Sequence, residues 1–355
     1  MNQHRLTNIK WHNKTAVEVL TFFVTNIELG LTASDVFKRS QKLGANKNLL
    51  VPEITAQFFR TTVIRDRKSQ TIQCSNLVLG DIVFLEKNTM VPADIRLVEV
   101  DNLAVEQYLL NGDSAPTYKN NLSTPLDSED FTKLKNMVYA GSFVLSGRAK
   151  GVVVAIGKFT KASVLGLNPA TPKVSFRSKR RIQNLKNAGI FVQQPDILKQ
   201  LKAVNTVIIN LPLNTADYKD LIRVISTKLG KNIIICPAAG SAKQINETVP
   251  GIVHLDKNQF REKSNKALLE ADYPLMCFDG VSQVEIVRYS KLLKLKNRMV
   301  FCIDSGQDTQ VYNEGLATLT IADSAIDRSL LEADIVLANT SDKPHFLKQI
   351  DSILS

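Results

Sequence analysis

Two aspartates that follow an apolar run are the residues best suited to bind a cation. Asp304 ends the run RMVFCID (298–304), and Asp308 comes four residues later. Hard cations such as Mg²⁺ bind carboxylate oxygens, commonly one or two from the protein, and water completes the shell. The pair predicts a weak Mg²⁺ site, and the sequence indicates no other cofactor. The alternative is structural: Asp304 ends a strand and Asp308 caps the helix that follows.

Apolar runs alternate with helical patterns from about 188 to 355. TVIIN ends at Asn210, NIIIC ends at Cys236 and RMVFCID ends at Asp304, with an amphipathic run (216–230) between the first two. This alternation predicts a parallel sheet with helices on both faces. Ligands of such sheets gather at the carboxyl ends of the strands. We therefore expect any chemistry of this half at those three residues.

The N-terminal half has a different pattern. Residues 14–45 predict two amphipathic helices, with Thr15 and Thr32 as caps and Gly44 at the end of the second. From about 57 to 165, short β-branched runs are separated by Gly, Asn and Asp, which is typical of strands joined by turns. The sequence therefore predicts helices followed by a β-rich module.

A basic segment separates the two halves. Residues 167–187 contain two prolines and a cluster of cations: Lys173, Arg177, Lys179, Arg180, Arg181 and Lys186. One interpretation is a solvated linker. The other is a contact with an acidic surface or with lipid headgroups.

Composition limits the classes of partner. Lys and Arg number 45 against 34 Asp and Glu among 355 residues, giving a net charge of +11, which favours anionic partners. Aromatic residues make up only 6% and do not alternate with basic ones, so we expect no nucleic acid as partner. Apolar runs are strand-sized, which predicts no membrane-spanning helix. The four cysteines lack zinc-like spacing and are expected to be reduced core thiols.

Motifs of the N-terminal half resemble the actuator domain of P-type cation-transporting ATPases. LVLGDIVFLEKNTMVPADIRLVE (77–99) is similar to the GDIV strand and VPADIRL signature of that family. VEQYLLNGDSAPTYK (105–119) resembles its VDES-x-LTGES-x-P-x-x-K motif. NMVYAGSFVLSGRAKGVVVAIGKFT (136–160) resembles the run that starts at its N-x-V-x-x-G-T. The motifs follow one another in the order that the family shows.

The C-terminal half resembles the phosphorylation domain of the same family. LKAVNTVIINLPLNT (201–215) aligns with the strand and loop V-D-T-V-x-x-DKTGT, and RMVFCIDSGQD (298–308) aligns with the strand that ends in GDGxND. LLEADIVLAN (330–339) is similar to the family's EADIVL. The resemblance implies a Rossmann-like fold of the haloacid-dehalogenase type.

The fold class implied is α+β followed by α/β, in four parts. They are an N-terminal helical segment (1–50), a β-rich actuator-like domain (51–166), a basic linker (167–187) and a haloacid-dehalogenase-like domain (188–355). The family's membrane helices and its nucleotide-binding insertion have no counterpart in these parts.

The catalytic positions implied by the resemblance are altered. The phosphorylated Asp aligns with Asn210, whose amide is a poor nucleophile. The Lys-Thr-Gly-Thr that follows is Leu-Pro-Leu-Asn (211–214), and the Lys that neutralises phosphate aligns with Gln283. The Glu that orients the hydrolytic water aligns with Asp113, which is one methylene shorter. With no catalytic residue intact, we do not expect an enzyme.

These departures predict a cytoplasmic pseudoenzyme that has lost ATP hydrolysis and ion transport. Its expected role is binding or regulation, and the partner is a membrane protein such as a full-length P-type ATPase, or an acidic membrane surface at the inner face. Two alternatives stay open. One is a sensor of anions or nucleotides that uses a cleft between the domains. The other is a residual Mg²⁺-dependent phosphatase of the haloacid-dehalogenase class.

Overall fold

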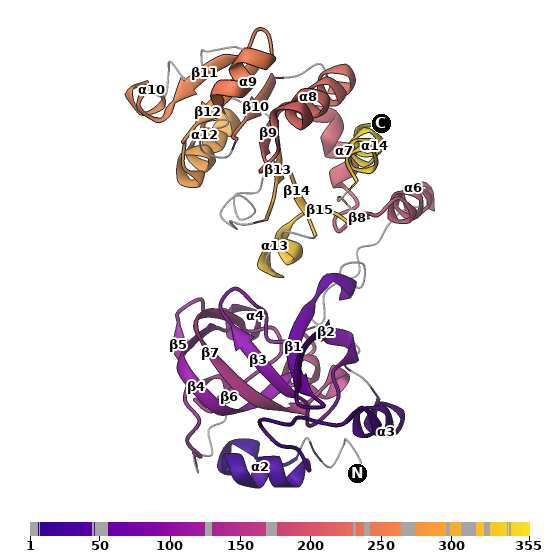
Figure 1. The fold of residues 1–355 in the computed structure, drawn as a ribbon, viewed down its shortest axis with the longest axis vertical. Helices are drawn as coiled ribbons and strands as arrows, with labels where there is room; N and C mark the ends of the chain where they lie inside the picture. The colour runs from indigo at the N-terminus through magenta and orange to yellow at the C-terminus, as the bar shows by residue number, and fades with distance from the viewer. Residues whose placement is uncertain are drawn as a thin grey trace. The chain divides into compact units, whose positions relative to one another are not determined.

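The structure is a computed structural model whose chain divides into two compact units, Met1–Thr171 and Pro172–Ser355 (Figure 1). It describes residues 6, 8–44, 46, 56–124, 130–167, 176–229, 232–237, 242–263, 274–295, 299–306, 317–322, 327–338, 340 and 342–355.

Two helices open unit 1, and side-chain caps fix where each begins. Helix α2 (Ala16–Phe22) begins after Thr15, whose hydroxyl accepts from the backbone N–H of Glu18, while the Glu18 carboxylate accepts from the Thr15 N–H. Helix α3 (Ala33–Leu43) begins after Thr32, whose hydroxyl accepts from the third residue of the helix. Both predicted caps are confirmed.

An antiparallel sheet makes up the rest of unit 1. Its order is β2-β1-β3-β7-β4-β5, with β6 also paired to β4. The strands are β1 (Arg60–Arg65), β2 (Lys68–Gln73), β3 (Ile82–Glu86), β4 (Asp94–Glu106), β5 (Thr117–Tyr118), β6 (Met137–Val138) and β7 (Phe143–Ala155). The 13-residue strands β4 and β7 pair along their length and bend at several register shifts, so they form the centre of the β-rich module. Short helices α4 (Tyr108–Asn111) and α5 (Lys161–Val164) interrupt the loops.

A buried arginine ties the N-terminal segment to this sheet. Arg96 of β4 is buried, and its guanidinium donates to the carbonyls of Trp11 (3.2 Å), Lys14 (2.7 Å) and Asn121 (3.2 Å). Burial lowers the pKa of Arg96 to about 10, which still leaves it protonated at neutral pH. Because carbonyls satisfy its donors, Arg96 fixes the start of α2 against β4.

A buried ion pair joins β1 to the turn before β3. Asp81, in the turn before β3, is fully buried and accepts from Arg65 Nε (2.9 Å) and Nη2 (2.6 Å). The backbone N–H of Val78 donates to the same carboxylate at 2.8 Å. These hydrogen bonds replace the water that the carboxylate of the GDIV motif loses when it is buried in the core.

Unit 2 is a sheet in the order β11-β12-β10-β9-β13-β14-β15-β8, parallel except for β8. The strands are β8 (Ile190–Val192), β9 (Val204–Asn210), β10 (Asn232–Ile235), β11 (Val253–Asp256), β12 (Leu275–Asp279), β13 (Met299–Asp304), β14 (Ala317–Ile321) and β15 (Ile335–Leu337). The helices are α6 (Phe176–Asn187), α7 (Ile197–Gln200), α8 (Thr215–Leu229), α9 (Ala242–Thr248), α10 (Lys257–Glu262), α12 (Gln283–Leu295), α13 (Asp327–Glu332) and α14 (Lys343–Leu354). Among the residues that the structure describes in either unit, no helix is long and apolar enough to cross a membrane.

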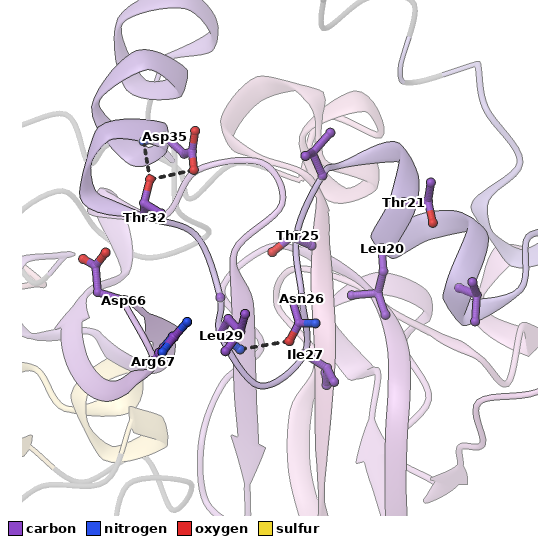
Figure 2. Close-up of a pocket in the computed structure, with 13 residues that line it drawn as sticks. Leu20, Thr21, Thr25, Asn26, Ile27, Leu29, Thr32, Asp35, Asp66 and Arg67 are labelled. Atoms are coloured by element: carbon purple, nitrogen blue, oxygen red, sulfur yellow. Dashed lines mark hydrogen bonds between the residues drawn. The ribbon is translucent and has the colours of Figure 1, made fainter.

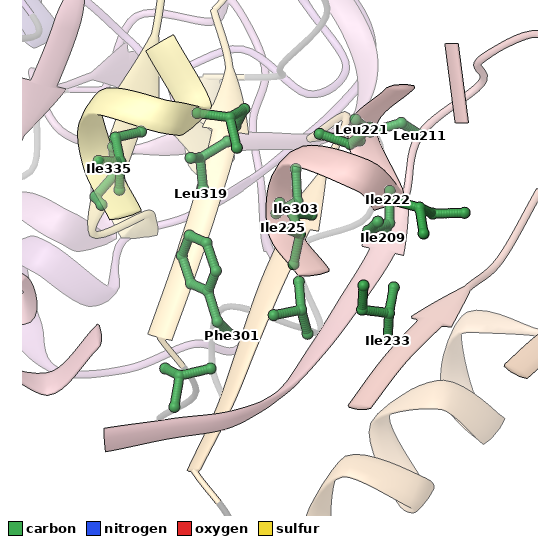
Figure 3. Close-up of a cluster of buried hydrophobic side chains, with 14 of the residues drawn as sticks. Ile209, Leu211, Leu221, Ile222, Ile225, Ile233, Phe301, Ile303, Leu319 and Ile335 are labelled. Atoms are coloured by element: carbon green, nitrogen blue, oxygen red, sulfur yellow. The ribbon is translucent and has the colours of Figure 1, made fainter. Parts of the chain in front are cut away.

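Alternate residues of the central strands pack on opposite faces of the sheet. Val207 and Ile209 of β9 belong to the same buried cluster as residues of α8 and α14, part of which Figure 3 shows. Ile208 belongs to a second cluster with residues of α10 and α12. Helices therefore cover both faces, which explains why the central strands are apolar throughout.

A helix lies within the segment predicted as a linker. Residues 176–187 form α6, and Leu185 is buried in the same cluster as β8. Arg181 Nη2 also donates to the carbonyl of Ile353 in α14 at 3.4 Å. Ile182 and Leu185 are three residues apart, so they lie on one face of the helix and give it a side that can pack.

Removal of the Asp81 carboxylate is expected to destabilise unit 1. The change Asp81→Ala leaves the Arg65 guanidinium buried without its partner, so we expect a loss of about 3–5 kcal/mol in the free energy of unfolding. Urea denaturation followed by circular dichroism measures it. The control is Asp101→Ala, which breaks an ion pair whose Arg148 and Asp101 side chains are 77% and 56% exposed, and should cost under about 1 kcal/mol. Equal losses in both variants would contradict this prediction.

Candidate active site

The centre of the unit 2 sheet brings two predicted site residues together. Strands β9 and β13 are adjacent and parallel, and Asn210 lies directly opposite Asp304 at their carboxyl ends. The amide Nδ2 of Asn210 donates to Asp304 Oδ2. The other oxygen, Oδ1, accepts from the backbone N–H of Gly306 at 2.6 Å. Because Asp304 is buried, these two donors stabilise its carboxylate in place of water.

The loop that follows Asn210 begins with a buried leucine and ends with the cap of a helix. Leu211 is only 2% exposed and belongs to the main core cluster, and its carbonyl accepts from the hydroxyl of Tyr218. Asn214 Oδ1 accepts from the backbone N–H of Asp217 at 2.9 Å, which caps the start of α8. Leu211 therefore fills space in the core and Asn214 begins a helix, where the resembling family carries a polar loop for phosphate.

Neighbouring strand ends supply a thiol and a hydroxyl. The backbone N–H of Cys236 donates to the Ile209 carbonyl at 2.8 Å, which places Cys236 beside Asn210. Burial, together with Cys277 and the charge of Asp304, raises the pKa of this thiol, so it stays neutral. On the other side, Thr320 of β14 lies opposite Asp304, and its buried hydroxyl has no partner among the described residues. Sequence reasoning missed Thr320, although it is a polar residue within the apolar run ATLTI.

The Mg²⁺ prediction rests on residues that the structure describes only in part. Asp304 ends β13 as expected, whereas Asp308 lies outside the described residues. No group of three His, Cys, Asp or Glu in the described ranges is placed to hold a metal ion. Both oxygens of Asp304 already accept hydrogen bonds. The described side chains at this edge therefore do not form a Mg²⁺ site by themselves, and the pair stays a prediction.

Two further predicted positions belong to other elements. Gln283 is the first residue of α12 in unit 2. Asp113 is exposed in unit 1, in the loop after α4, which ends at Gly112 with a φ of 75°. Its backbone N–H donates to Asn111 Oδ1 at 2.9 Å, and its Oδ1 accepts from the N–H of Ala115 at 2.8 Å. One oxygen of Asp113 thus shapes its own turn.

Buried titratable groups in the actuator motifs hold loops to the sheet. Asp94 accepts from the backbone N–H groups of Ala140 (3.0 Å) and Lys161 (2.7 Å), and burial raises its pKa to about 7. Lys119 donates from Nζ to Gln107 Oε1 (3.2 Å), and burial lowers its pKa to about 7. Both side chains are nearly inaccessible, so they act on the fold and not on a substrate. The sequence contained both residues in its motifs but gave no sign of their burial.

Comparison with known proteins assigns the β-rich module. The model of the family described as P-type ATPase actuator domain matches residues 57–166. Residues 57–166 of unit 1 are similar to the actuator domain of P-type ATPases. The resemblance noted from the motifs is therefore confirmed for this part of the chain, which contains all of the unit 1 sheet described above.

Curated relatives are P-type cation ATPases that match part of the chain. Sodium/potassium exporting P-type ATPase 1 of Saccharomyces cerevisiae is 31% identical over 186 residues, which are 49% of this chain and 16% of the relative. Cation-transporting ATPase pma1 of Synechocystis is 43% identical over 100 residues, 28% of this chain and 11% of the relative. Calcium-transporting ATPase 1 of Lactococcus lactis is 35% identical over 147 residues, 41% of this chain and 16% of the relative. The chain thus spans under a fifth of the length of each relative.

The buried carboxyl of Asp94 is expected to make unit 1 less stable as the pH rises. Its pKa is about 7 in the folded state against an ordinary value of 3.8, so the folded state binds the proton more tightly. The stability it contributes is present below about pH 4 and is lost as the pH rises through 7, by at most about 1.4 kcal/mol per pH unit. Urea denaturation of the wild type and of Asp94→Asn at pH 4 to 8 measures the difference in slope. Parallel curves for the two proteins would contradict the prediction.

A carboxylate at position 210 is expected to be unstable unless a cation binds. Asn210→Asp removes the amide donor and places a like charge against Asp304, so we expect a loss of about 2 kcal/mol at pH 7. Addition of MgCl₂ should raise the melting temperature of this variant and leave the wild type unchanged. The matched control is Asn210→Asp combined with Asp304→Asn, which restores one amide and one carboxylate. If MgCl₂ raised the melting temperature of the wild type as well, the prediction would be contradicted, and the metal site would include more than the described residues.

Proposed function

We propose that this chain is a P-type-ATPase-like pseudoenzyme that neither hydrolyses ATP nor drives ion transport, and that it acts by binding. The observation that supports the proposal is the hydrogen bond from the Asn210 amide to the buried Asp304 carboxylate. In the resembling family a carboxylate at this strand end attacks the γ-phosphate of ATP. The nitrogen of an amide is a poor nucleophile because its lone pair is delocalised into the carbonyl.

The surroundings of Asn210 support the same proposal. The amide occupies one oxygen of Asp304 and Gly306 occupies the other, so this carboxylate is engaged without a metal. Leu211, which aligns with the Lys of the family's loop, is buried in the main core cluster and brings no cation to a phosphate. Since the family couples transport to the acyl phosphate, a chain that cannot form it cannot run that cycle. We propose on this ground that unit 2 is a haloacid-dehalogenase-like scaffold without phosphorylation activity.

The proposed role is regulation of a membrane protein such as a cation-transporting ATPase, from the cytoplasm at the inner face of the membrane. Two features support it. The actuator domain is a module that its relatives carry within membrane transporters, and the net charge of +11 favours acidic surfaces. Helix α6 presents the exposed cations Arg180 and Lys186. A titration of the chain into a purified, detergent-solubilised P-type ATPase, read as that enzyme's rate of ATP hydrolysis, tests this role.

Labelling with [γ-³²P]ATP in Mg²⁺ tests the loss of phosphorylation. We expect no acid-stable label on the wild type or on Asn210→Asp, because the loop at 211–214 and Gln283 differ as well. A phosphorylating P-type ATPase run alongside shows that the assay works. Label on the wild type that hydroxylamine removes would contradict the proposal, since hydroxylamine cleaves acyl phosphates.

Two other results would favour the alternatives. Turnover of a phosphate ester that disappears in Asp304→Ala would favour a residual phosphatase. Heat released on titration with nucleotides or inorganic phosphate, without turnover, would favour an anion sensor. The sensor hypothesis concerns a cleft between the two units and stays a prediction.

A further inference from the structure

Three helices lie next to one another on one face of the unit 2 sheet. Helices α6, α8 and α14 all contribute to the main core cluster, whereas α10 and α12 contribute to the cluster on the opposite face. Helix α14 contacts both of the others. Arg181 of α6 donates to the Ile353 carbonyl at 3.4 Å, and Lys228 of α8 forms an ion pair with Asp351 at 3.2 Å. Figure 1 shows the three helices on one side of unit 2, and we call them the helical layer.

The acids of the helical layer are already engaged by lysines. Helix α6 carries five Lys or Arg and no Asp or Glu. Helices α8 and α14 carry three Asp between them. Lys343 of α14 pairs with Asp217 and Asp220 of α8, both at 2.8 Å, while Asp351 pairs with Lys228. Each acid of the layer thus has a lysine of the adjacent helix as its partner.

The helical layer also carries exposed cations that form no ion pair within the described part of the chain. They are Arg180, Lys186, Lys219, Arg223 and Lys348. The pKa of the Asp220 carboxyl is lowered mainly by the hydrogen bond from Lys343, and the charge of Arg223 lowers it further. The outer surface of the layer is therefore positive.

Two of these cations lie at one level along α8 and α14. The ion pairs of Lys343 and Asp351 join the two ends of α8 to α14, so the helices run side by side in the same direction. Lys348 lies between these two pairs. It is therefore beside the middle of α8, which carries Arg223.

A third cation, on α6, lies near the same level. Gln349, next to Lys348, donates to the carbonyl of Ala188 at 2.9 Å, and Lys186 lies two residues earlier. Neighbouring helices pack with their axes about 8–10 Å apart. Lys186, Lys348 and Arg223, which we call the basic row, therefore span roughly 16–20 Å.

The width of the basic row decides which kind of anion it fits. A single phosphate or carboxylate group is too small to contact all three side chains. The major groove of B-DNA is about 12 Å wide and admits one helix, so a layer of three helices does not enter it. The described side chains of these helices include no exposed aromatic residue on which a base could stack. The row fits a flat and extended anionic surface, such as a bilayer with anionic headgroups.

We propose that the helical layer binds the anionic headgroups of a phospholipid bilayer through the basic row. The proposal rests on the location at the inner face of the membrane, which is part of the proposed function, and it names the surface that makes the contact. No large apolar side chain is exposed on the described part of the layer, so nothing inserts among the acyl chains. The contact is therefore electrostatic, reversible and sensitive to salt.

Two exposed arginines of unit 1 lie beside acids instead. Arg148 pairs with Asp101 at 3.1 Å. Figure 2 shows Arg67 next to Asp66 at the edge of a pocket of about 810 Å³, which Asp35 also lines. These mixed charges do not favour an anionic surface over a neutral one, so unit 1 supplies control positions.

Co-sedimentation of the full chain with phospholipid vesicles tests the proposal. The probes are vesicles of phosphatidylcholine alone and vesicles that also contain about 30% phosphatidylserine. In about 0.1 M NaCl we expect half of the chain on the anionic vesicles at roughly 0.2–5 mM accessible lipid, and no binding to the neutral ones. Raising NaCl to about 0.5 M should weaken binding at least about tenfold, because salt screens the cations.

Neutralising the basic row should release the chain from the anionic vesicles. Lys186→Gln, Arg223→Gln and Lys348→Gln together should weaken binding by about a hundredfold, since each Lys or Arg near an anionic bilayer contributes about fivefold. A second variant, with Lys186→Arg, Arg223→Lys and Lys348→Arg, keeps the charge of the row and should bind as the wild type does. It separates the loss of charge from damage to the fold.

The matched control removes three exposed charges from unit 1. Lys42→Gln, Arg67→Gln and Lys87→Gln together lower the net charge by the same amount and should leave vesicle binding unchanged. An equal loss of binding in this control and in the row variant would overturn the proposal. So would equal binding to neutral and anionic vesicles, or a wild type that stays unbound at about 5 mM anionic lipid.

Two further outcomes have distinct meanings. Tight binding to a DNA duplex that the row variant loses, without binding to vesicles, would assign the helical layer to nucleic acid and overturn the proposal. A chain that binds anionic vesicles but leaves the ATP hydrolysis of a detergent-solubilised P-type ATPase unchanged would support the layer and contradict the regulatory role. An effect on that enzyme without vesicle binding would do the reverse.

Discussion

The arrangement at the centre of unit 2 depends on one hydrogen bond between an amide and a carboxylate. Asp304 is buried at the end of β13, and a buried charge is tolerated only where donors surround it. Asn210 provides one donor from the adjacent strand and the backbone of Gly306 provides another. The amide donor thus stabilises the Asp304 carboxylate, as a bound cation would if position 210 held a second carboxylate. Both oxygens of this carboxylate therefore accept hydrogen bonds from the chain itself.

The sequence predicted the regular parts of this fold well, because their signals are local. Thr15 and Thr32 are caps with the expected spacing, and the apolar runs that end at Asn210 and Asp304 are strands. Strands β8, β11 and β12 escaped notice. They have three to five residues each, too few for a period to show, and they are defined by their pairing within the sheet.

The candidate site could be predicted only in part. Alignment of the motifs places Asn210 where the family has its phosphorylated Asp. The poor nucleophilicity of this position follows from its amide side chain. That its amide faces Asp304 follows from the register of two strands far apart in sequence, which no local pattern contains. The same holds for Asp94 and Lys119, whose shifted pKa values arise from burial by distant loops. Composition and spacing do not report desolvation, so these groups had to be seen in place.

Helix α6 gives the basic segment a property that an unstructured tether lacks. Its buried Leu185 and the hydrogen bond from Arg181 to Ile353 attach it to β8 and α14. The orientation of its exposed cations relative to the sheet of unit 2 is therefore fixed. An anionic surface that bound these cations would also fix the orientation of the sheet edge that carries Asn210. An unstructured segment of the same charge would only keep that edge near the surface.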